Sequence, residues 1–131
     1  MPRLSGHQAG IENMRRLVQI LNEYPIKYVT LYGFSTENWN RPKAEVNGLF
    51  RIVADFMDKT SPEIHKQGVK LRHLGRLEEL PKSLQHSINK AVELTKNNSG
   101  MTLSIAFNYG ARTEILDAVR RLIADGVPPK D

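Results

Sequence analysis

The stretch Ile26–Pro42, IKYVTLYGFSTENWNRP, constrains the fold of this chain more than any other segment. Its first half is rich in β-branched and aromatic residues, which is the composition of a buried strand. Its second half, Ser35–Arg41, is a run of polar side chains around one tryptophan. Pro42 suits the first turn of a following helix, where a missing N–H costs nothing. This order predicts an α/β fold with a ligand site beyond the carboxyl end of the strand.

The rest of the chain continues the same alternation. Apolar spacing predicts helices over 11–22, 43–59, 78–95 and 111–124, and strands over 26–34, 69–74 and 101–107. We expect residues 1–10 to form a loop, and Ser61-Pro62 to interrupt or restart the second helix. The order predicts one domain over 1–131, with a mostly parallel sheet and flanking helices. Because no strand precedes the first helix or follows the last one, we expect a domain that is incomplete at both ends.

Composition and charge narrow the function classes. The 131 residues include 19 Lys and Arg against 14 Asp and Glu, a net charge of +5, which favours an anionic partner such as nucleic acid, a phosphorylated metabolite or an anionic membrane surface. The basic residues are spread along the chain, which argues against nucleic acid. The absence of cysteine excludes a disulfide framework and a cysteine nucleophile. Without a membrane-spanning run or a signal-peptide core, the expected location is cytoplasmic.

Two basic residues near the amino end form the first candidate site. Arg3 and His7, with Gly6 and Gly10 beside them, would lie just before the helix predicted from Ile11. The free N–H groups and the dipole of a helix start favour an anion, and an arginine and a histidine would add donors to a phosphate. The alternative is a frayed basic start in which the glycines only form turns.

The polar loop after the first strand is the second candidate site. As a binding loop, its hydroxyls and guanidinium would contact phosphate, its carboxylate and amide would handle a proton, and its indole would cover an apolar ligand. As a connection, a side chain would cap the next helix and the indole would pack in the core. So many functional side chains in a row are unusual for a mere connection. They are Ser35, Thr36, Glu37, Asn38, Trp39 and Arg41.

Two further features allow two interpretations each. The helix over 43–59 has a broad apolar face, which is either core or the wall of a pocket for a long apolar ligand. Asn108, Tyr109 and Arg112 follow the strand over 101–107, where they form either a site wall or a helix cap.

Three segments carry a resemblance to a known family: GHQAG, TLYGFSTENWNRPKAEV and LPKSLQHSINKAVELTKNNSGMTLSIAFNYGARTEI. Together they resemble the cis-prenyltransferases, of the undecaprenyl diphosphate synthase (isoprenyl transferase) type. The FSTENWNRP run is far more specific than a short glycine pattern. The resemblance extends over essentially all 131 residues.

The resemblance implies parallel strands and helices around an elongated apolar tunnel, in a homodimer. It implies the condensation of isopentenyl diphosphate onto an allylic diphosphate, with Mg²⁺, to give cis double bonds. By position, Arg3 and His7 would hold the allylic diphosphate, and Asn38 would help to remove the proton. The helix over 43–59 would line the tunnel. The residues of the substrate-contacting loop would be Ser35, Thr36, Glu37, Trp39 and Arg41.

The same resemblance implies groups that this sequence does not contain. The family has an Asp-Gly-Asn motif with a Mg²⁺-binding aspartate before the matched segment, and an Arg-x-Ser region and a glutamate after it. We therefore expect no Mg²⁺ ligand in this span and no turnover by the span alone. Arg76 stands where the family has an aspartate, and Ala111 replaces a glycine. The alternative function is a non-catalytic subunit that binds a prenyl diphosphate or a full-length partner.

Overall fold

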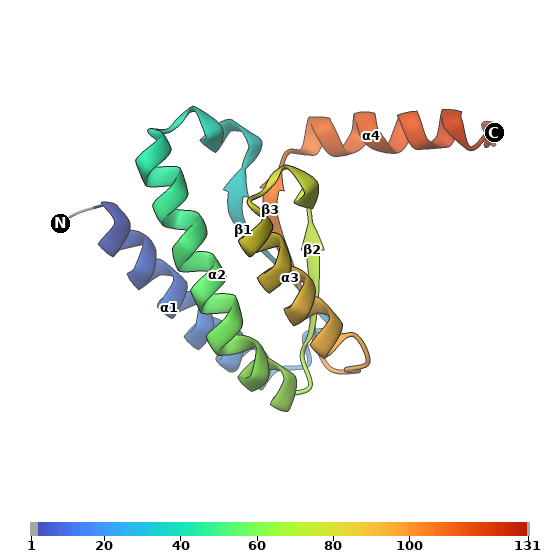
Figure 1. Cartoon of the computed structure of the whole chain (residues 1–131). Coiled ribbons are helices and arrows are strands. Elements are labelled where there is room, and N and C mark those ends of the chain that lie inside the picture. The colour runs from blue at the N-terminus through green and yellow to red at the C-terminus, as the bar shows by residue number, and fades with distance from the viewer. Residues whose placement is uncertain (1–2, 131) are drawn as a thin grey trace.

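The computed structural model describes residues 3–130, which alternate between helices and parallel strands (Figure 1). The elements are α1 (Arg3–Leu21), β1 (Tyr28–Ser35), the 3-10 turn η1 (Thr36–Asn40), α2 (Lys43–Lys66), β2 (Lys70–Leu74), the 3-10 turn η2 (Leu77–Glu79), α3 (Lys82–Thr95), β3 (Thr102–Tyr109) and α4 (Ala111–Ala124). The predicted α/β class is confirmed. The helix predicted over 111–124 has the observed bounds of α4.

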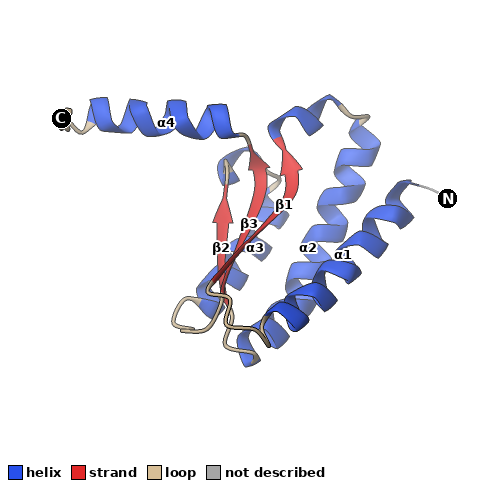
Figure 2. Cartoon of the chain, turned by 180° about the vertical axis from the view of Figure 1, so that it is seen from behind, coloured by secondary structure: helices blue, strands red, loops and turns tan. Residues whose placement is uncertain are grey.

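The three strands form one parallel sheet in the order β1-β3-β2. All three point their carboxyl ends the same way, and α1, α2 and α3 cover one face of the sheet (Figure 2). The pairing of β1 with β3 shifts register on both sides of Phe34. Such irregularities bend a strand and aim its next residues in a new direction. The bend lies where β1 passes into the polar loop.

The core lies between the sheet and the helices α2 and α3. Leu84 and Ala91 of α3 and Val69 before β2 are fully buried. Burying an aliphatic side chain of the size of Leu or Val contributes about 1.5–3 kcal/mol. At the carboxyl end of β1, the ring of Phe34 stacks on Phe107 with centroids 5.3 Å apart. Since Phe34 precedes the polar loop directly, this aromatic contact fixes the base of the loop.

The first helix begins earlier than its sequence pattern suggests. α1 starts at Arg3, so the loop predicted over 1–10 is wrong for residues 3–10, and residues 1–2 lie outside the described residues. Leu4 packs closely on Gly48 of α2, where any larger side chain would collide with it. This contact favours helical structure from the first turn, although Gly6 and Gly10 each disfavour a helix by about 1 kcal/mol.

The second helix is continuous through its proline. α2 runs to Lys66 with Pro62 inside, so the predicted interruption at Ser61-Pro62 is wrong. Proline lacks the N–H that would close a helical turn. However, Thr60, Ser61 and Ile64 are buried, and this packing holds the turn in place.

The third helix begins later than predicted. The segment over 78–81 forms η2 and then an extended turn at Leu80, which precedes Pro81. A residue before proline is disfavoured in helical conformation, which explains why α3 starts only at Lys82.

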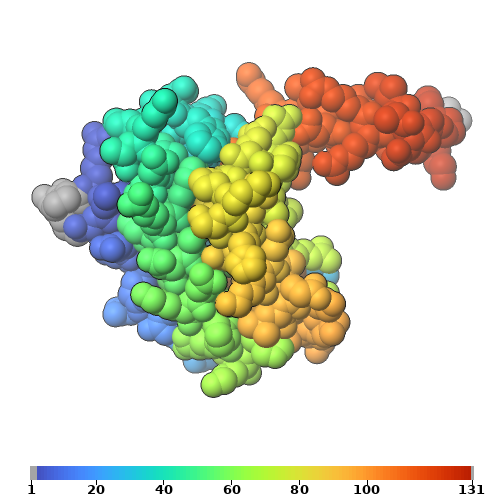
Figure 3. All heavy atoms as spheres, in the orientation of Figure 1, coloured from blue at the N-terminus to red at the C-terminus, as the bar shows by residue number. Residues whose placement is uncertain are grey.

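The last helix projects from the carboxyl end of the sheet (Figure 3). It has no buried residue. Its larger apolar side chains are all exposed, namely Ile115, Leu116, Val119, Leu122 and Ile123. No helix in residues 3–130 combines the length and the apolar content needed to cross a membrane.

Candidate functional site

The polar loop after β1 folds into the short turn η1, which its own side chains cap. The Ser35 hydroxyl accepts a hydrogen bond from the backbone N–H of Glu37 at 3.2 Å. The Asn38 side-chain oxygen accepts one from the backbone N–H of Ser35 at 3.0 Å. Such reciprocal caps satisfy N–H groups that a helix start leaves free. These caps belong to η1, whereas α2 begins after Pro42 with no side-chain cap, so the predicted cap of the next helix is wrong.

Trp39 fastens this loop to the neighbouring strand. Its indole N–H donates to the Asn108 side-chain oxygen at 2.8 Å. Its ring meets the rings of Phe34 and Phe50 edge-on, with centroids 5.5 and 5.3 Å away. The side chain remains 41% exposed, so it belongs to the rim of the core and not to its interior.

Asn108 joins the carboxyl ends of all three strands. It lies at the end of β3, is 1% exposed and has a positive φ of 55°, which asparagine tolerates better than most residues. Besides accepting from Trp39 after β1, its amide donates to the Arg76 carbonyl and to Glu79 after β2, both at 2.9 Å. The sequence predicts that the residues after β3 form either a site wall or a helix cap. In the structure, Asn108 instead connects the segments that follow all three strands.

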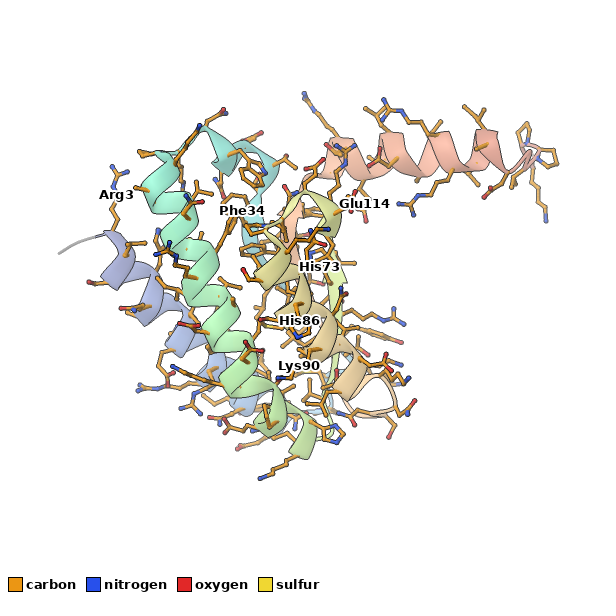
Figure 4. The ribbon with its side chains drawn as sticks, viewed as in Figure 1. Arg3, Phe34, His73, His86, Lys90 and Glu114 are labelled. Carbon is orange, nitrogen blue, oxygen red and sulfur yellow. The ribbon has the colours of Figure 1, made fainter. Side chains whose placement is uncertain are left out.

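Three basic side chains converge on one carboxylate at the amino-terminal ends of α1 and α2. Glu45 accepts hydrogen bonds from Arg3 at 3.0 Å and Arg41 at 3.3 Å, and His7 Nε2 lies 3.4 Å from it. The Arg3 guanidinium, helped by His7 and Arg41, lowers the pKa of the Glu45 carboxyl. Figure 4 shows Arg3 at the start of α1, beside the first turns of α2.

The predicted placement of Arg3 and His7 ahead of a helix is wrong, because both lie within α1, one turn apart. Their convergence with Arg41 is a finding of the tertiary structure. Glu45 was not among the site residues predicted from the sequence. Arg41 is four residues before Glu45, but it is extended and precedes α2, so helical periodicity does not predict their contact.

An apolar cavity of about 280 Å³ opens beside these basic residues, between α1, α2 and the sheet. His7, Asn38 and Arg41 line its polar end. Its apolar walls include Ile11, Met14, Leu49, Val53, Phe56, Met57, Ile105 and Phe107. Part of the broad α2 face lines this cavity, and part of it, such as Phe50 and Ile64, packs in the core.

A smaller cavity of about 30 Å³ lies further along the same two helices. Both cavities are lined by Met14, Phe56, Met57 and Ile105. Around the smaller one, Glu63 of α2 accepts hydrogen bonds from Arg15 at 3.2 Å and from Gln19 at 2.6 Å. Polar contacts thus tie α1 to α2 at both ends. Glu45 and Glu63 are eighteen residue steps apart on α2, which corresponds to about 27 Å at 1.5 Å per residue.

A wider, open cavity of about 590 Å³ lies over the carboxyl ends of β1 and β3. Its polar lining includes Ser35, Thr36, Glu37, Asn38, Tyr109, Arg112 and Thr113. The start of α4 contributes to it, since the N-cap Gly110 offers no side-chain cap. Asn38 lines both this cavity and the apolar one, together with Tyr32 and Gly33. Asn38 therefore lies where a cavity with a polar lining and a cavity with a largely apolar lining meet.

Arg76, which stands where the family has an aspartate, has a structural partner. Its guanidinium donates two hydrogen bonds to Asp117 of α4, both at 3.0 Å, and a third to Glu79 at 3.1 Å. These contacts raise the pKa of Arg76 and lower that of Asp117. Nearby, the Tyr109 hydroxyl donates to Glu114 at 2.7 Å, which raises the pKa of Tyr109. This polar cluster attaches α4 to the ends of β2 and β3.

The Mg²⁺ that the resemblance implies finds no ligand set in the described part of the chain. Residues 3–130 bring together no group of three or more His, Asp or Glu side chains that could hold a metal ion. Three acidic residues near the site, Glu45, Glu79 and Asp117, are each paired with arginine.

Comparison with known proteins agrees with this geometry. The profile of a family described as putative undecaprenyl diphosphate synthase matches residues 1–130. An isoprenyl transferase of Heliobacterium mobile is 42% identical over 129 residues, which are 96% of this chain and 50% of that protein. A Micrococcus luteus protein named ditrans,polycis-undecaprenyl-diphosphate synthase, (2E,6E)-farnesyl-diphosphate specific, is 42% identical over 95% of this chain and 50% of its own length.

Solved structures show the same fold. Lavandulyl diphosphate synthase from Lavandula x intermedia, crystallised in complex with dimethylallyl diphosphate, superimposes with a TM-score of 0.92 at 32% identity, over 95% of this chain and 53% of that one. A probable undecaprenyl diphosphate synthase from Campylobacter jejuni gives 0.85 at 32% identity, over 94% and 60%. The chain spans about half the length of the curated relatives it matches. It belongs to the undecaprenyl diphosphate synthase family of prenyltransferases.

Proposed function

We propose that this chain forms the part of a cis-prenyltransferase that binds an allylic diphosphate and encloses its hydrocarbon tail. The observation that carries the proposal is that His7 and Arg41 line an apolar cavity, while Arg3 contacts the same Glu45 carboxylate as they do. Arginine and histidine donors suit diphosphate oxygens, and a dry apolar wall suits an isoprenoid chain. The relatives named above are prenyltransferases acting on such substrates.

In the proposed reaction, isopentenyl diphosphate would occupy the wide cavity, near Thr36 and Arg112. Its terminal alkene carbon bonds to the first carbon of the allylic substrate, whose diphosphate leaves with the bonding electron pair. A proton is then lost from the resulting cation to form the cis double bond. The released diphosphate would accept that proton, and Asn38, at the meeting point of the two cavities, would help to position this transfer, since a neutral amide is too weak a base to accept the proton itself.

The proposal also includes Mg²⁺ and a homodimer, which rest on the family resemblance. A cytoplasmic location and contact with an anionic membrane surface rest on sequence composition, and nucleic acid is not proposed as a partner. No step is assigned to Mg²⁺, because residues 3–130 supply no ligand set for it.

Titration calorimetry with farnesyl diphosphate tests the binding part. We expect Arg41→Ala to weaken binding about tenfold or more, because a charge-assisted contact to the diphosphate is lost. The matched control is Arg51→Ala, which removes an exposed arginine of α2 outside both cavities. Equal affinities of the wild type and Arg41→Ala would contradict the proposal.

A non-catalytic subunit that binds prenyl diphosphate is the second candidate. It would need only the apolar cavity and the basic residues beside it, which the described residues carry. Binding without Mg²⁺ and without turnover would support it. Radiolabelled isopentenyl diphosphate decides between the two, since product above background excludes the non-catalytic role.

A further inference from the structure

We infer that Glu45 is a positioning residue that gathers Arg3, His7 and Arg41 into one diphosphate-binding patch. The inference rests on the proposed function, in which this patch holds the allylic diphosphate. The Glu45 carboxylate cannot itself bind a diphosphate, because the two groups are both anionic and repel each other. Its place at the centre of the three basic side chains is what needs an explanation.

The contacts are arranged around Glu45. One carboxylate oxygen, Oε1, lies 3.4 Å from His7 and 3.3 Å from Arg41, and the other, Oε2, lies 3.0 Å from Arg3. The Glu45 side chain is 11% exposed, whereas those of Arg3 and Arg41 are 77% and 41% exposed. The carboxylate thus lies beneath, and the guanidinium groups reach outward from it to the mouth of the cavity.

Three basic groups at one place repel each other unless an anion lies between them. They come from two separate segments, α1 and the turn before α2, so no local structure forces them together. Without Glu45, the three basic side chains would extend into solvent and would no longer point toward one place. Binding would then have to restore that order at an entropic cost.

The arrangement leaves donors free for a ligand. A guanidinium carries five N–H groups, and Glu45 engages a single nitrogen, Nη1, of each arginine. The alternative to a positioning role is that Glu45 competes with the ligand. In that case Glu45 would occupy the position of the diphosphate, and the diphosphate would have to displace it. A competitor would use the outward donors as well, and it would not lie beneath the basic side chains.

The test compares wild type and Glu45→Gln by titration with inorganic pyrophosphate and with farnesyl diphosphate. We expect both ligands to bind about tenfold more weakly to Glu45→Gln, since the patch loses its order. Glu93→Gln makes the same charge change at an exposed residue paired with Lys96 and should match the wild type. Binding that is unchanged or tighter in Glu45→Gln would overturn the inference.

Two further variants separate positioning from folding. Glu45→Asp keeps the charge and should restore part of the affinity. In an Arg41→Ala background, Glu45→Gln should cost clearly less than in the wild type, because one of the groups it positions is gone. Equal costs in both backgrounds would mean a general structural effect and overturn the inference. Failure of the wild type to bind farnesyl diphosphate would instead refute the proposed function.

Discussion

Asn108 is the residue on which the strand-end loops depend. Its single amide group satisfies the Trp39 indole, the Arg76 carbonyl and the Glu79 carboxylate. These three partners belong to segments that follow different strands. A short side chain with both a donor and an acceptor, in a backbone conformation with positive φ, suits asparagine better than any other residue.

Asn108→Ala should destabilise the protein by about 2–4 kcal/mol, because it leaves the partners of a buried amide without hydrogen bonds. Urea unfolding measures this loss. Asn97→Ala, at an exposed position in the turn after α3, is the control and should unfold like the wild type. An unchanged free energy of unfolding for Asn108→Ala would show that the hydrogen bonds of Asn108 do not stabilise the protein.

His73 makes the stability depend on pH. Burial is the main cause that lowers the pKa of His73 below 6.5, and its hydrogen bond to the Phe107 carbonyl opposes this in part. Because a carbonyl only accepts, His73 Nε2 carries the hydrogen in that 2.8 Å contact. The unfolded chain therefore takes up a proton at higher pH than the folded chain does.

The stability that comes from neutral His73 is present above about pH 6.5 and is lost as the pH falls toward the folded pKa. We expect His73→Gln, which keeps an N–H donor, to lose less unfolding free energy than the wild type between about pH 7 and pH 5. Urea titrations at each pH measure the difference. His65→Gln, at an exposed position, should keep the wild-type slope, and an identical slope for His73→Gln would refute the assignment.

At the scale of elements, α1 and α2 contact each other at some positions and line the apolar cavity at others. They touch closely where Leu4 meets Gly48, and polar contacts of Glu45 and Glu63 join them at either end. Between these ties the helices leave room over the sheet, which is the apolar cavity.

Gly10 allows the cavity to be filled without a clash. It lines the cavity, and a Cβ atom added there would meet no atom within 4 Å. Gly10→Leu should stabilise α1 by up to about 1 kcal/mol through helix propensity. It should also weaken farnesyl diphosphate binding about tenfold, while inorganic pyrophosphate binds as before. Gly10→Ala is the matched control, and equal binding of farnesyl diphosphate by both variants would contradict a tail in this cavity.

At the scale of the whole molecule, α4 stands apart from the body. It buries no residue, and the Arg76–Asp117 and Tyr109–Glu114 contacts hold its first turns to the strand ends. The face of the sheet that Figure 2 turns to the viewer carries no helix from residues 3–130. The described residues therefore form a parallel sheet that helices cover on one face. Polar contacts attach α4, whose larger apolar side chains are exposed, to the strand ends.

Asp117→Asn should loosen α4 without affecting the body. We expect amide hydrogen exchange over 111–124 to become several-fold faster, because a paired carboxylate is removed, while exchange in α3 and β3 stays unchanged. Exchange mass spectrometry of fragments reads both regions in one sample. Asp125→Asn, at the exposed end of the same helix, controls for the lost charge. Faster exchange throughout the chain would mean that Asp117 supports the whole fold.

Sequence patterns determined the α/β alternation, the parallel sheet and the polar loop after β1, because these follow from local hydrophobic period and from connection length. They misjudged the start of α1 and the passage through Pro62, where long-range packing outweighs glycine and proline preferences. Only the tertiary structure decided that Arg3, His7 and Arg41 meet at Glu45 and that a cavity opens between α1 and α2. Contacts between residues about forty positions apart leave no periodic trace in a sequence, since they depend on how whole helices pack.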